Sequence, residues 1–218
     1  KDINGSMFGF SDDPIQKVRV GIIGLGNRGN TLLEMLQYLV ENNHAEIIAL
    51  SDISEKKVIK AANKLAAWQA KEATIYYKSE TEWKKLAERD DIDLVIISTP
   101  WKLHAPMAIY CMENRKHVGS EVPIASTIED CWKIIQTSER TKKHCMMMEN
   151  CNYNEEELWI LNMIQEGVFG DITHTEGAYL HDLRALLLDD TYYQGQWRLH
   201  EHVDRNGNFY TTHGLGPI

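Results

Sequence analysis

The sequence has few cysteines, and their placement matches no familiar covalent framework. Its four cysteines are irregularly spaced and include no Cys-x-x-Cys pair, which argues against a structural zinc site and against a set of disulfides. We therefore expect buried free thiols at Cys111, Cys131, Cys145 and Cys151. The nine histidines include the pair His200-x-His202. No third ligand stands at a familiar spacing from this pair, so the sequence predicts no metal.

The sequence also lacks an excess of positive charge and any long apolar run. Its 23 Lys and Arg against 32 Asp and Glu give a net charge of -9, which argues against nucleic acid or an anionic membrane as a partner and favours a small molecule. No apolar stretch reaches the length that crosses a bilayer. Residues 1–5 do not form a signal peptide, but a removed export signal would leave no trace. The compartment therefore stays open between cytoplasm and a bacterial periplasmic or secreted location.

An apolar stretch followed by a glycine-rich turn stands near the start of the chain. Residues 17–23 read as a buried strand, and Gly24, Gly26 and Gly29 follow it with the spacing Gly-x-Gly-x-x-Gly. The first glycine permits a tight turn, the second lets the backbone approach a pyrophosphate, and the third lets a helix pack on the strand. Free amides near Arg28 would face the phosphates at a helix N-terminus. This stretch predicts a dinucleotide site.

A second strand supplies the context that a glycine triplet needs, because glycine-rich turns are common. Residues 45–50 read as a strand that ends in Ser51 and Asp52, and Asp52 stands 23 residues beyond Gly29. A carboxylate at this place accepts hydrogen bonds from ribose hydroxyls and repels a 2′-phosphate, so NAD is favoured over NADP. The structural alternative is a solvated loop aspartate.

Strands and helices alternate over the first 150 residues. After an N-terminal arm over residues 1–16, this alternation predicts a doubly wound parallel sheet over residues 17–150, covered by helices on both faces. The predicted strands after the first two are 75–78, 93–100, 117–120 and 144–148, and the predicted helices are 30–41, 54–72, 81–86, 104–114 and 127–140. Ligands bind beyond the carboxyl ends of such strands, where the chain has Asp52, Trp101 to His104, Glu121 and the pair Glu149 and Asn150.

The pattern changes in residues 151–218, which we interpret as part of a second, α+β domain. A helix over 155–166 precedes a strand over 171–180, and this strand is expected to belong to a second sheet. Residues 189–218 are rich in Tyr, Trp, His, Arg and Asn but have little periodicity, which is typical of a site built on loops.

The motifs together resemble a known family. The glycine turn, Ser98-Thr99-Pro100 with His104 beyond it, and Glu121-x-Pro123 resemble the glucose-fructose oxidoreductase and inositol dehydrogenase (Gfo/Idh/MocA) family. This family pairs an NAD(P)-binding Rossmann domain with a second domain on an open antiparallel sheet. More narrowly, the chain resembles glycoside hydrolase family 109, the NAD-dependent α-N-acetylgalactosaminidases, at residues 148–150, 176–184, 197–198, 205–208 and 212–217.

Two residues depart from the patterns of these families. Dehydrogenases of the broad family usually have a lysine between the glutamate and the proline, where this chain has Val122. This weakens an alternative function as an NAD-dependent sugar dehydrogenase. The glycosidase pattern has a proline where this chain has Thr211, which we expect to alter a turn without removing a catalytic group.

The resemblance implies a redox-neutral glycosidase that does not use the usual two carboxylates. NAD takes a hydride from C3 of a terminal N-acetylgalactosamine, the ketone acidifies the C2 proton, loss of that proton expels the aglycone, and water and the hydride are then added. The resemblance places Tyr210 and His213 beside C2 and C3 and Tyr179 near the leaving group, without dividing acid and base roles among them. It assigns substrate contacts to Glu149, Tyr179, Arg198, Tyr210, Thr211, Thr212 and His213.

Each assignment has a structural alternative. Tyr179 could be a rim residue, His213 a turn residue bonded to backbone, and Arg198 a surface partner of Glu201, an interaction worth little. The resemblance assigns cofactor contacts to Gly24, Gly26, Asn27, Arg28, Asp52, Trp101, Lys102, Leu103, His104, Glu121, Val122 and Asn150. For Trp101 the alternative is a core anchor.

The resemblance also implies that the second domain is incomplete, because proteins of this family continue beyond the last motif. We therefore expect exposed apolar surface or an unpaired sheet edge near residues 171–180, which would favour homo-oligomers. Three functions stay open: the α-N-acetylgalactosaminidase, the sugar dehydrogenase, and an inactive nucleotide-binding module.

Overall fold

A computed structural model describes residues 5–218 of the chain. The described residues divide into two units, with the boundary between Met147 and Met148. The boundary lies within three residues of the one expected from the change in sequence pattern.

The first unit is built on a sheet of six parallel strands in the order β3-β2-β1-β4-β5-β6. This is the strand order of dinucleotide-binding folds, and it confirms the doubly wound parallel sheet. In register, Ile22 of β1 pairs with Leu50 of β2 on one side and with Ile96 of β4 on the other. The strands are β1 (Val18–Ile23), β2 (Ala45–Ser51), β3 (Thr74–Tyr76), β4 (Leu94–Ile97), β5 (His117–Ser120) and β6 (Cys145–Met147).

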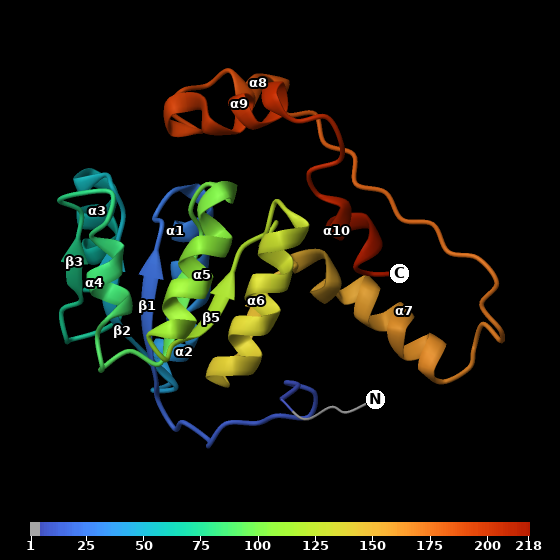
Figure 1. The fold of residues 1–218 in the computed structure, drawn as a ribbon, viewed down its shortest axis with the longest axis horizontal. Helices are drawn as coiled ribbons and strands as arrows, with labels where there is room; N and C mark the ends of the chain where they lie inside the picture. Colours follow the sequence, from blue (N-terminus) through green and yellow to red (C-terminus); the bar gives the residue numbers. More distant parts are fainter. Residues whose placement is uncertain (1–4) are drawn as a thin grey trace. The chain divides into compact units, whose positions relative to one another are not determined.

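Helices cover both faces of this sheet (Figure 1). An ion pair between Lys64 of α3 and Glu34 of α1 joins these helices on one face, while α4 and α6 both pack against α5 on the other. The helices are α1 (Asn27–Met35), α2 (Gln37–Glu41), α3 (Glu55–Leu65), α4 (Trp83–Ala87), α5 (His104–Glu113) and α6 (Ile128–Thr141), with a 3-10 turn η1 (Trp101–Leu103) before α5.

Two predicted helices of this unit differ from those observed. The helix expected over 30–41 is divided at Leu36 into α1 and α2. The helix expected over 54–72 ends at Leu65. Beyond its end, the side chain of Gln69 binds the backbone of β2. Its side-chain amide accepts a hydrogen bond from the backbone N–H of Ile47 at 2.8 Å and donates one to the carbonyl of the same residue at 3.0 Å. These contacts draw the chain out of the helix and onto β2.

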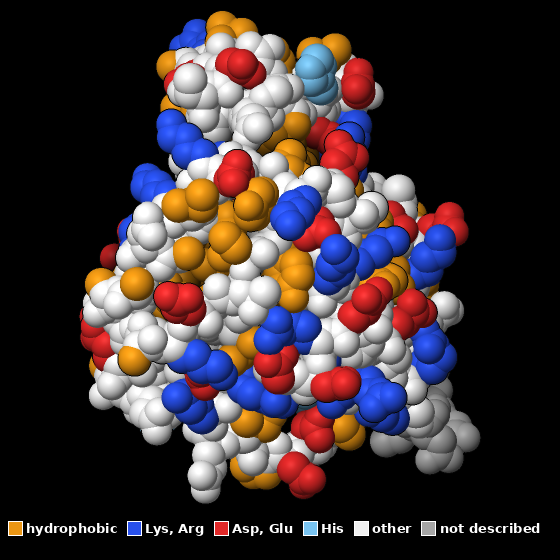
Figure 2. Space-filling model, turned by 90° about the vertical axis from the view of Figure 1, so that its left-hand side faces the viewer, with side chains coloured by type: hydrophobic (Ala, Val, Ile, Leu, Met, Phe, Trp, Pro, Cys, Tyr) orange, Lys and Arg blue, Asp and Glu red, His pale blue; other side chains and the backbone are white. Residues whose placement is uncertain are grey.

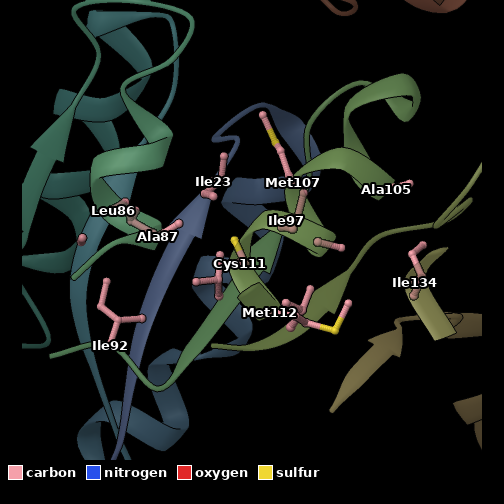
Figure 3. Close-up of a cluster of buried hydrophobic side chains, with 14 of the residues drawn as sticks. Ile23, Leu86, Ala87, Ile92, Ile97, Ala105, Met107, Cys111, Met112 and Ile134 are labelled. Carbon is pink, nitrogen blue, oxygen red and sulfur yellow. The ribbon is translucent and has the colours of Figure 1, made fainter. Parts of the chain in front are cut away.

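The core of the first unit lies between the strands and helices α4, α5 and α6 (Figure 3). Gly21 in β1 admits Leu86 of α4, since a Cβ at Gly21 would lie 2.7 Å from a Leu86 methyl carbon. All four cysteines are free, as expected. The expectation that all are buried is wrong: Cys111 is buried within the core, whereas Cys131 lies on the exposed side of α6.

The segment before β1 forms neither helix nor strand over residues 5–16, and the first four residues of the predicted arm lie outside the described residues. Its anchor is Asp12, whose carboxylate lies 2.9 Å from Nζ of Lys143 and 3.0 Å from Nε2 of His117. The hydrogen bond from Lys143 lowers the pKa of Asp12 to about 2. Upstream, the ring of Phe10 packs against His144. The arm is therefore fastened near the starts of β5 and β6.

The second unit is helical wherever it has regular structure. The strand expected over 171–180 does not form, and no residue from 148 to 218 belongs to a strand, so the prediction of an open antiparallel sheet is not met. A strand is stable only beside a partner strand, and these residues contain none. The loop expected over 189–218 is also wrong in part, because it contains helices. The elements are η2 (Asn150–Tyr153), α7 (Glu155–Gln165), α8 (Arg184–Leu187), η3 (Gln194–Gln196), α9 (Trp197–Asp204) and α10 (Thr211–Leu215).

Apolar side chains are exposed in the second unit. Ile172 and Leu180 lie in the stretch where this was expected, and Leu180 is 93% exposed. Helix α7 also leaves Leu158, Trp159 and Ile160 open to solvent. On the face drawn in Figure 2, basic and acidic side chains are intermingled and form no area of one sign. In residues 5–218, no helix has both the length and the apolar character that a membrane span requires.

Candidate nucleotide site and histidine cluster

The glycine turn after β1 is tightly packed on its inner side and open at its centre. A Cβ at Gly29 would lie 2.0 Å from the carbonyl oxygen of Gly24, and a Cβ at Gly24 would lie 2.7 Å from the backbone of Ser98. Gly24 also has φ of +91°, which favours glycine. In contrast, a Cβ at Gly26 would meet nothing within 4 Å. The turn thus leaves open space where a pyrophosphate approaches the backbone in dinucleotide-binding folds.

The carboxylate of Asp52 is fixed beside this turn at the carboxyl end of β2. One carboxylate oxygen accepts a hydrogen bond from the backbone N–H of Leu25 at 2.7 Å, and the other accepts one from Ser54 at 2.8 Å. Each oxygen has a second lone pair, which remains for a ribose hydroxyl. The side chain is half-buried. Its position therefore fits the ribose contact that the sequence predicts.

An ion pair between Arg28 and Glu121 joins the start of α1 to the loop after β5. Nε of Arg28 at the start of α1 lies 2.6 Å from a carboxylate oxygen of Glu121, which follows β5. Glu121 is 7% exposed, and the neighbouring Val122 is also buried. Asn27, at the first helical position, is exposed. The structure thus brings three predicted cofactor residues, Arg28, Glu121 and Val122, to one edge of the sheet.

The loop after β4 places its predicted cofactor residues in different environments. His104 is buried, with Nδ1 2.8 Å from the carbonyl oxygen of Pro123 and Nε2 2.7 Å from that of Thr99. Burial lowers the pKa of His104, although both carbonyls and Glu121 favour the charged form. This ring joins the loops that follow β4 and β5, and its contact with a cofactor stays a prediction. Trp101 is buried, Leu103 half-buried and Lys102 exposed.

These residues fit a bound dinucleotide. The open space over Gly26, the N-terminal end of α1 and the fixed carboxylate of Asp52 are the three features that such a ligand uses. Gly24, Gly26, Asn27, Arg28 and Asp52 would hold it. Asn150 belongs to the second unit, where its amide lies 3.8 Å from Sγ of Cys151, and its role as a nucleotide contact stays a prediction.

The second unit gathers predicted catalytic residues around one imidazole. The ring of His213 in α10 stacks on that of Tyr210 with 4.7 Å between centroids and an interplanar angle of 8°. The ring of Tyr179 meets the same imidazole edge-on at 4.6 Å. Nδ1 of His213 lies 2.5 Å from a carboxylate oxygen of Glu149. Residues that are up to 64 positions apart in the sequence thus form one histidine cluster: Glu149, Tyr179, Tyr210 and His213.

Two acidic groups of this cluster, Tyr179 and Glu149, have opposite pKa shifts. Burial raises the pKa of the Tyr179 phenol, and the nearby Arg198 only partly opposes this effect. Burial also disfavours the charged form of Glu149, but the nearby Thr212 hydroxyl and the hydrogen bonds from the Cys151 amide and His213 outweigh it and lower its pKa. At neutral pH, Tyr179 therefore carries its proton and Glu149 is ionised.

The guanidinium of Arg198 is part of the same neighbourhood. Arg198 is 7% exposed, lies 4.9 Å from the ring centroid of Tyr210, and donates a hydrogen bond to the Tyr193 hydroxyl at 2.5 Å. Arg198 is buried and therefore does not fit the alternative of a surface ion pair, and Glu201 pairs with Arg205 at 2.7 Å. Of the other predicted substrate contacts, Thr212 adjoins Glu149 and Thr211 is exposed.

Sequence analysis missed Cys151 and Tyr193 as members of this neighbourhood. Glu149, Cys151 and His213 offer an oxygen, a sulfur and a nitrogen within 4.8 Å of one another, a set that could hold a metal ion. Their spacing in the sequence follows no familiar metal motif. Two ligand atoms on one tetrahedral zinc lie about 3.3 Å apart, whereas the Glu149 oxygen and His213 nitrogen are 2.5 Å apart. The contact therefore has the length of a hydrogen bond.

Comparison with known proteins agrees with both parts of this description. The family model "Glycosyl hydrolase 109, C-terminal domain" matches residues 153–218. A glycosyl hydrolase family 109 protein of Shewanella sp. (strain W3-18-1) is 46% identical over 98% of this chain and 46% of its own length. An alpha-N-acetylgalactosaminidase of Shewanella oneidensis is 45% identical with the same coverage. The chain thus spans about half the length of the curated relatives it matches.

Solved structures share the fold. A WlbA dehydrogenase from Chromobacterium violaceum, in complex with NADH and UDP-GlcNAcA, has a TM-score of 0.60 and 27% identity over 72% of this chain and 42% of its own. A scyllo-inositol dehydrogenase from Lactobacillus casei has a TM-score of 0.63 at 21% identity, covering 72% of this chain and 43% of that one, a likeness in fold alone. The family model "Oxidoreductase family, NAD-binding Rossmann fold" matches residues 18–149. The chain therefore belongs to this NAD-binding oxidoreductase family, and its residues 153–218 are similar to the C-terminal domain of glycosyl hydrolase family 109.

Proposed function

We propose that the protein cleaves terminal α-N-acetylgalactosaminides in a redox-neutral cycle that uses bound NAD. The support is the combination of an NAD-binding Rossmann fold with relatives that are 44 to 46% identical over nearly the whole chain and carry glycosidase names. The observation that carries the proposal is the histidine cluster, which assembles groups able to move protons around His213.

The carboxylates of the second unit favour this chemistry over direct hydrolysis. Most glycosidases place two carboxyl groups on either side of the scissile bond. Among the described residues from 148 to 218, Glu149 is the one acidic residue whose whole side chain is buried, and His213 and the Cys151 amide already bind it. A mechanism that needs one imidazole and a phenol suits these residues better than one that needs a pair of acids.

The side chains of the cluster divide the work between them. When bound, NAD accepts a hydride from C3 of the sugar and returns it at the end of the cycle. His213 takes the C2 proton, which the C3 carbonyl acidifies, and Tyr179 gives its proton to the departing oxygen at C1. Because burial raises the pKa of Tyr179, this phenol is protonated when the leaving group needs a proton. Arg198 supplies a buried positive charge for sugar hydroxyls.

A sugar dehydrogenase is the second candidate, and Val122 weighs against it. The position between Glu121 and Pro123 is apolar and buried. It therefore offers no ammonium group to assist the net oxidation of a sugar hydroxyl. Such a function needs net reduction of NAD, whereas the glycosidase cycle leaves NAD unchanged.

Incubation with NAD and a chromogenic α-N-acetylgalactosaminide separates the candidates. Release of the aglycone without net NADH supports the proposal, and NADH that accumulates with free sugar supports the dehydrogenase. Bound NAD with neither product supports a nucleotide-binding module without activity. In D₂O, we expect deuterium at C2 of the released sugar, since direct displacement at C1 leaves that hydrogen in place. Release without deuterium would contradict the proposed elimination.

A further inference from the structure

Glu149 is fixed from two sides before any ligand is considered. The carboxylate oxygen that lies 2.5 Å from Nδ1 of His213 also accepts the backbone N–H of Cys151 at 3.1 Å. The residue is 1% exposed. It stands at the N-terminal end of η2, while His213 lies in α10. The contact therefore joins two elements of the second unit through one buried oxygen.

The charge of this carboxylate determines where the proton of His213 lies. An ionised carboxylate can only accept hydrogen bonds, and hydrogen bonds from its neighbours lower the pKa of Glu149 despite burial. The atom facing it, Nδ1 of His213, must therefore be the donor. Neutral imidazole carries one proton, so Nε2 then has a free lone pair.

The surroundings of the ring leave Nε2 available. Tyr210 stacks on one face of the imidazole at 8° between planes, and Tyr179 approaches edge-on. Within residues 5–218, His213 makes its side-chain hydrogen bond at Nδ1, and none is formed by Nε2. A base needs a fixed ring with a free nitrogen, and this ring has both.

We propose that Glu149 is a positioning residue that holds His213 in the Nδ1–H tautomer and directs Nε2 at the C2 proton. This assignment rests on the proposed function and replaces the sugar contact that the sequence suggests for Glu149. In the sugar already oxidised at C3, the C2–H bond breaks and an Nε2–H bond forms. The C2–H electron pair becomes the C1=C2 bond as the C1–O bond breaks, and the aglycone oxygen takes the Tyr179 proton. Glu149 stabilises the resulting imidazolium and stays ionised.

The tautomer can be measured without substrate or cofactor. Long-range ¹H–¹⁵N spectra of histidine-labelled protein distinguish a protonated Nδ1 from a protonated Nε2, and a His213→Gln variant assigns the signals among the nine histidines. We expect wild-type His213 to carry its proton on Nδ1, and Glu149→Gln to give a mixture of tautomers because the amide can donate as well as accept. A wild-type ring with its proton on Nε2 overturns the assignment, as does an unchanged tautomer in Glu149→Gln.

Kinetics distinguish a positioning role from sugar binding. For Glu149→Gln, we expect C2–deuterium exchange and kcat to fall about 10²- to 10⁴-fold, the range lost when a base is misoriented, with KM within about threefold of wild type. A sugar-binding Glu149 predicts the opposite split, with KM raised and kcat little changed. Glu156→Gln, on the exposed side of α7, is the matched control and should match wild type. If wild type releases no aglycone but keeps the Nδ1–H tautomer, the proposed function fails while the positioning contact stands.

Discussion

Replacing Gly26 by alanine should abolish NAD binding with little effect on folding. The φ of Gly26 is -66°, which alanine adopts without strain, and its added Cβ would meet no protein atom within 4 Å. Alanine is a poorer residue than glycine before a helix, which costs about 0.5–1 kcal/mol. The new methyl group would occupy the space where the pyrophosphate approaches the backbone. Folding and binding are therefore affected very differently.

The two effects can be given magnitudes. NAD at about 100 times its dissociation constant stabilises the folded protein by about 2.7 kcal/mol. In a chain of this size, 1 kcal/mol corresponds to roughly 2–4 °C in Tm. We therefore expect NAD to raise the Tm of wild type by roughly 5–11 °C. The Gly26→Ala variant should melt roughly 1–4 °C lower than wild type without NAD and show no rise with it.

Thermal unfolding with and without NAD measures both effects, and Gly29→Ala serves as the contrasting variant. A Cβ at Gly29 would lie 2.0 Å from the Gly24 carbonyl oxygen, so the backbone must move, and we expect a loss of about 1–3 kcal/mol in stability without NAD. If Gly26→Ala keeps the full NAD-dependent rise in Tm, the dinucleotide does not cross the glycine turn, and the assignment of this turn to the pyrophosphate is wrong.

Three further predictions concern other parts of the chain. Asp93 accepts hydrogen bonds from the Arg19 side chain, which lower its pKa. The stability that this contact adds to the folded protein is therefore complete above the unfolded pKa of about 3.9. It is lost as the pH falls through the lower pKa of Asp93 in the folded protein. Urea unfolding should show Asp93→Asn about 1–3 kcal/mol less stable than wild type at pH 7, with the difference shrinking in acid. A constant difference down to pH 2 would contradict this. Alkylation followed by mass spectrometry should modify exposed Cys131 before Cys111, whose pKa burial raises, and equal rates would contradict the packing of α5. Sedimentation should show self-association at high concentration, with Trp159→Glu reducing it because that side chain is 65% exposed. A monomer at all concentrations would contradict a role for this apolar surface.

The first unit could be predicted from the sequence because its signals are local and mutually consistent. The central strands β1, β2 and β4 are rich in apolar residues. Gly24 and Gly29 have conformational or packing requirements that other residues do not meet. The errors lie at helix ends, where long-range contacts decide. Nothing in the local pattern around Leu65 indicates that Gln69 binds the backbone of β2.

The second unit could be predicted only in part, because its contacts join distant residues. Resemblance pointed to Tyr179, Tyr210 and His213, and the structure brings them together. The role of Glu149 could not be read from sequence, since its partner His213 lies 64 residues away. The strand expected over 171–180 was wrong because alternation of side chains describes one strand, whereas a sheet also needs a neighbour.

The sheet of the first unit has two very short borders. Its outermost strands, β3 and β6, have three residues each, so few backbone groups at either border are available to another chain. A strand from another chain that paired with either edge would form few hydrogen bonds. Short edge strands are one way in which natural sheets resist aggregation. Contacts between copies of the first unit are therefore expected to depend on side chains more than on pairing of sheet edges.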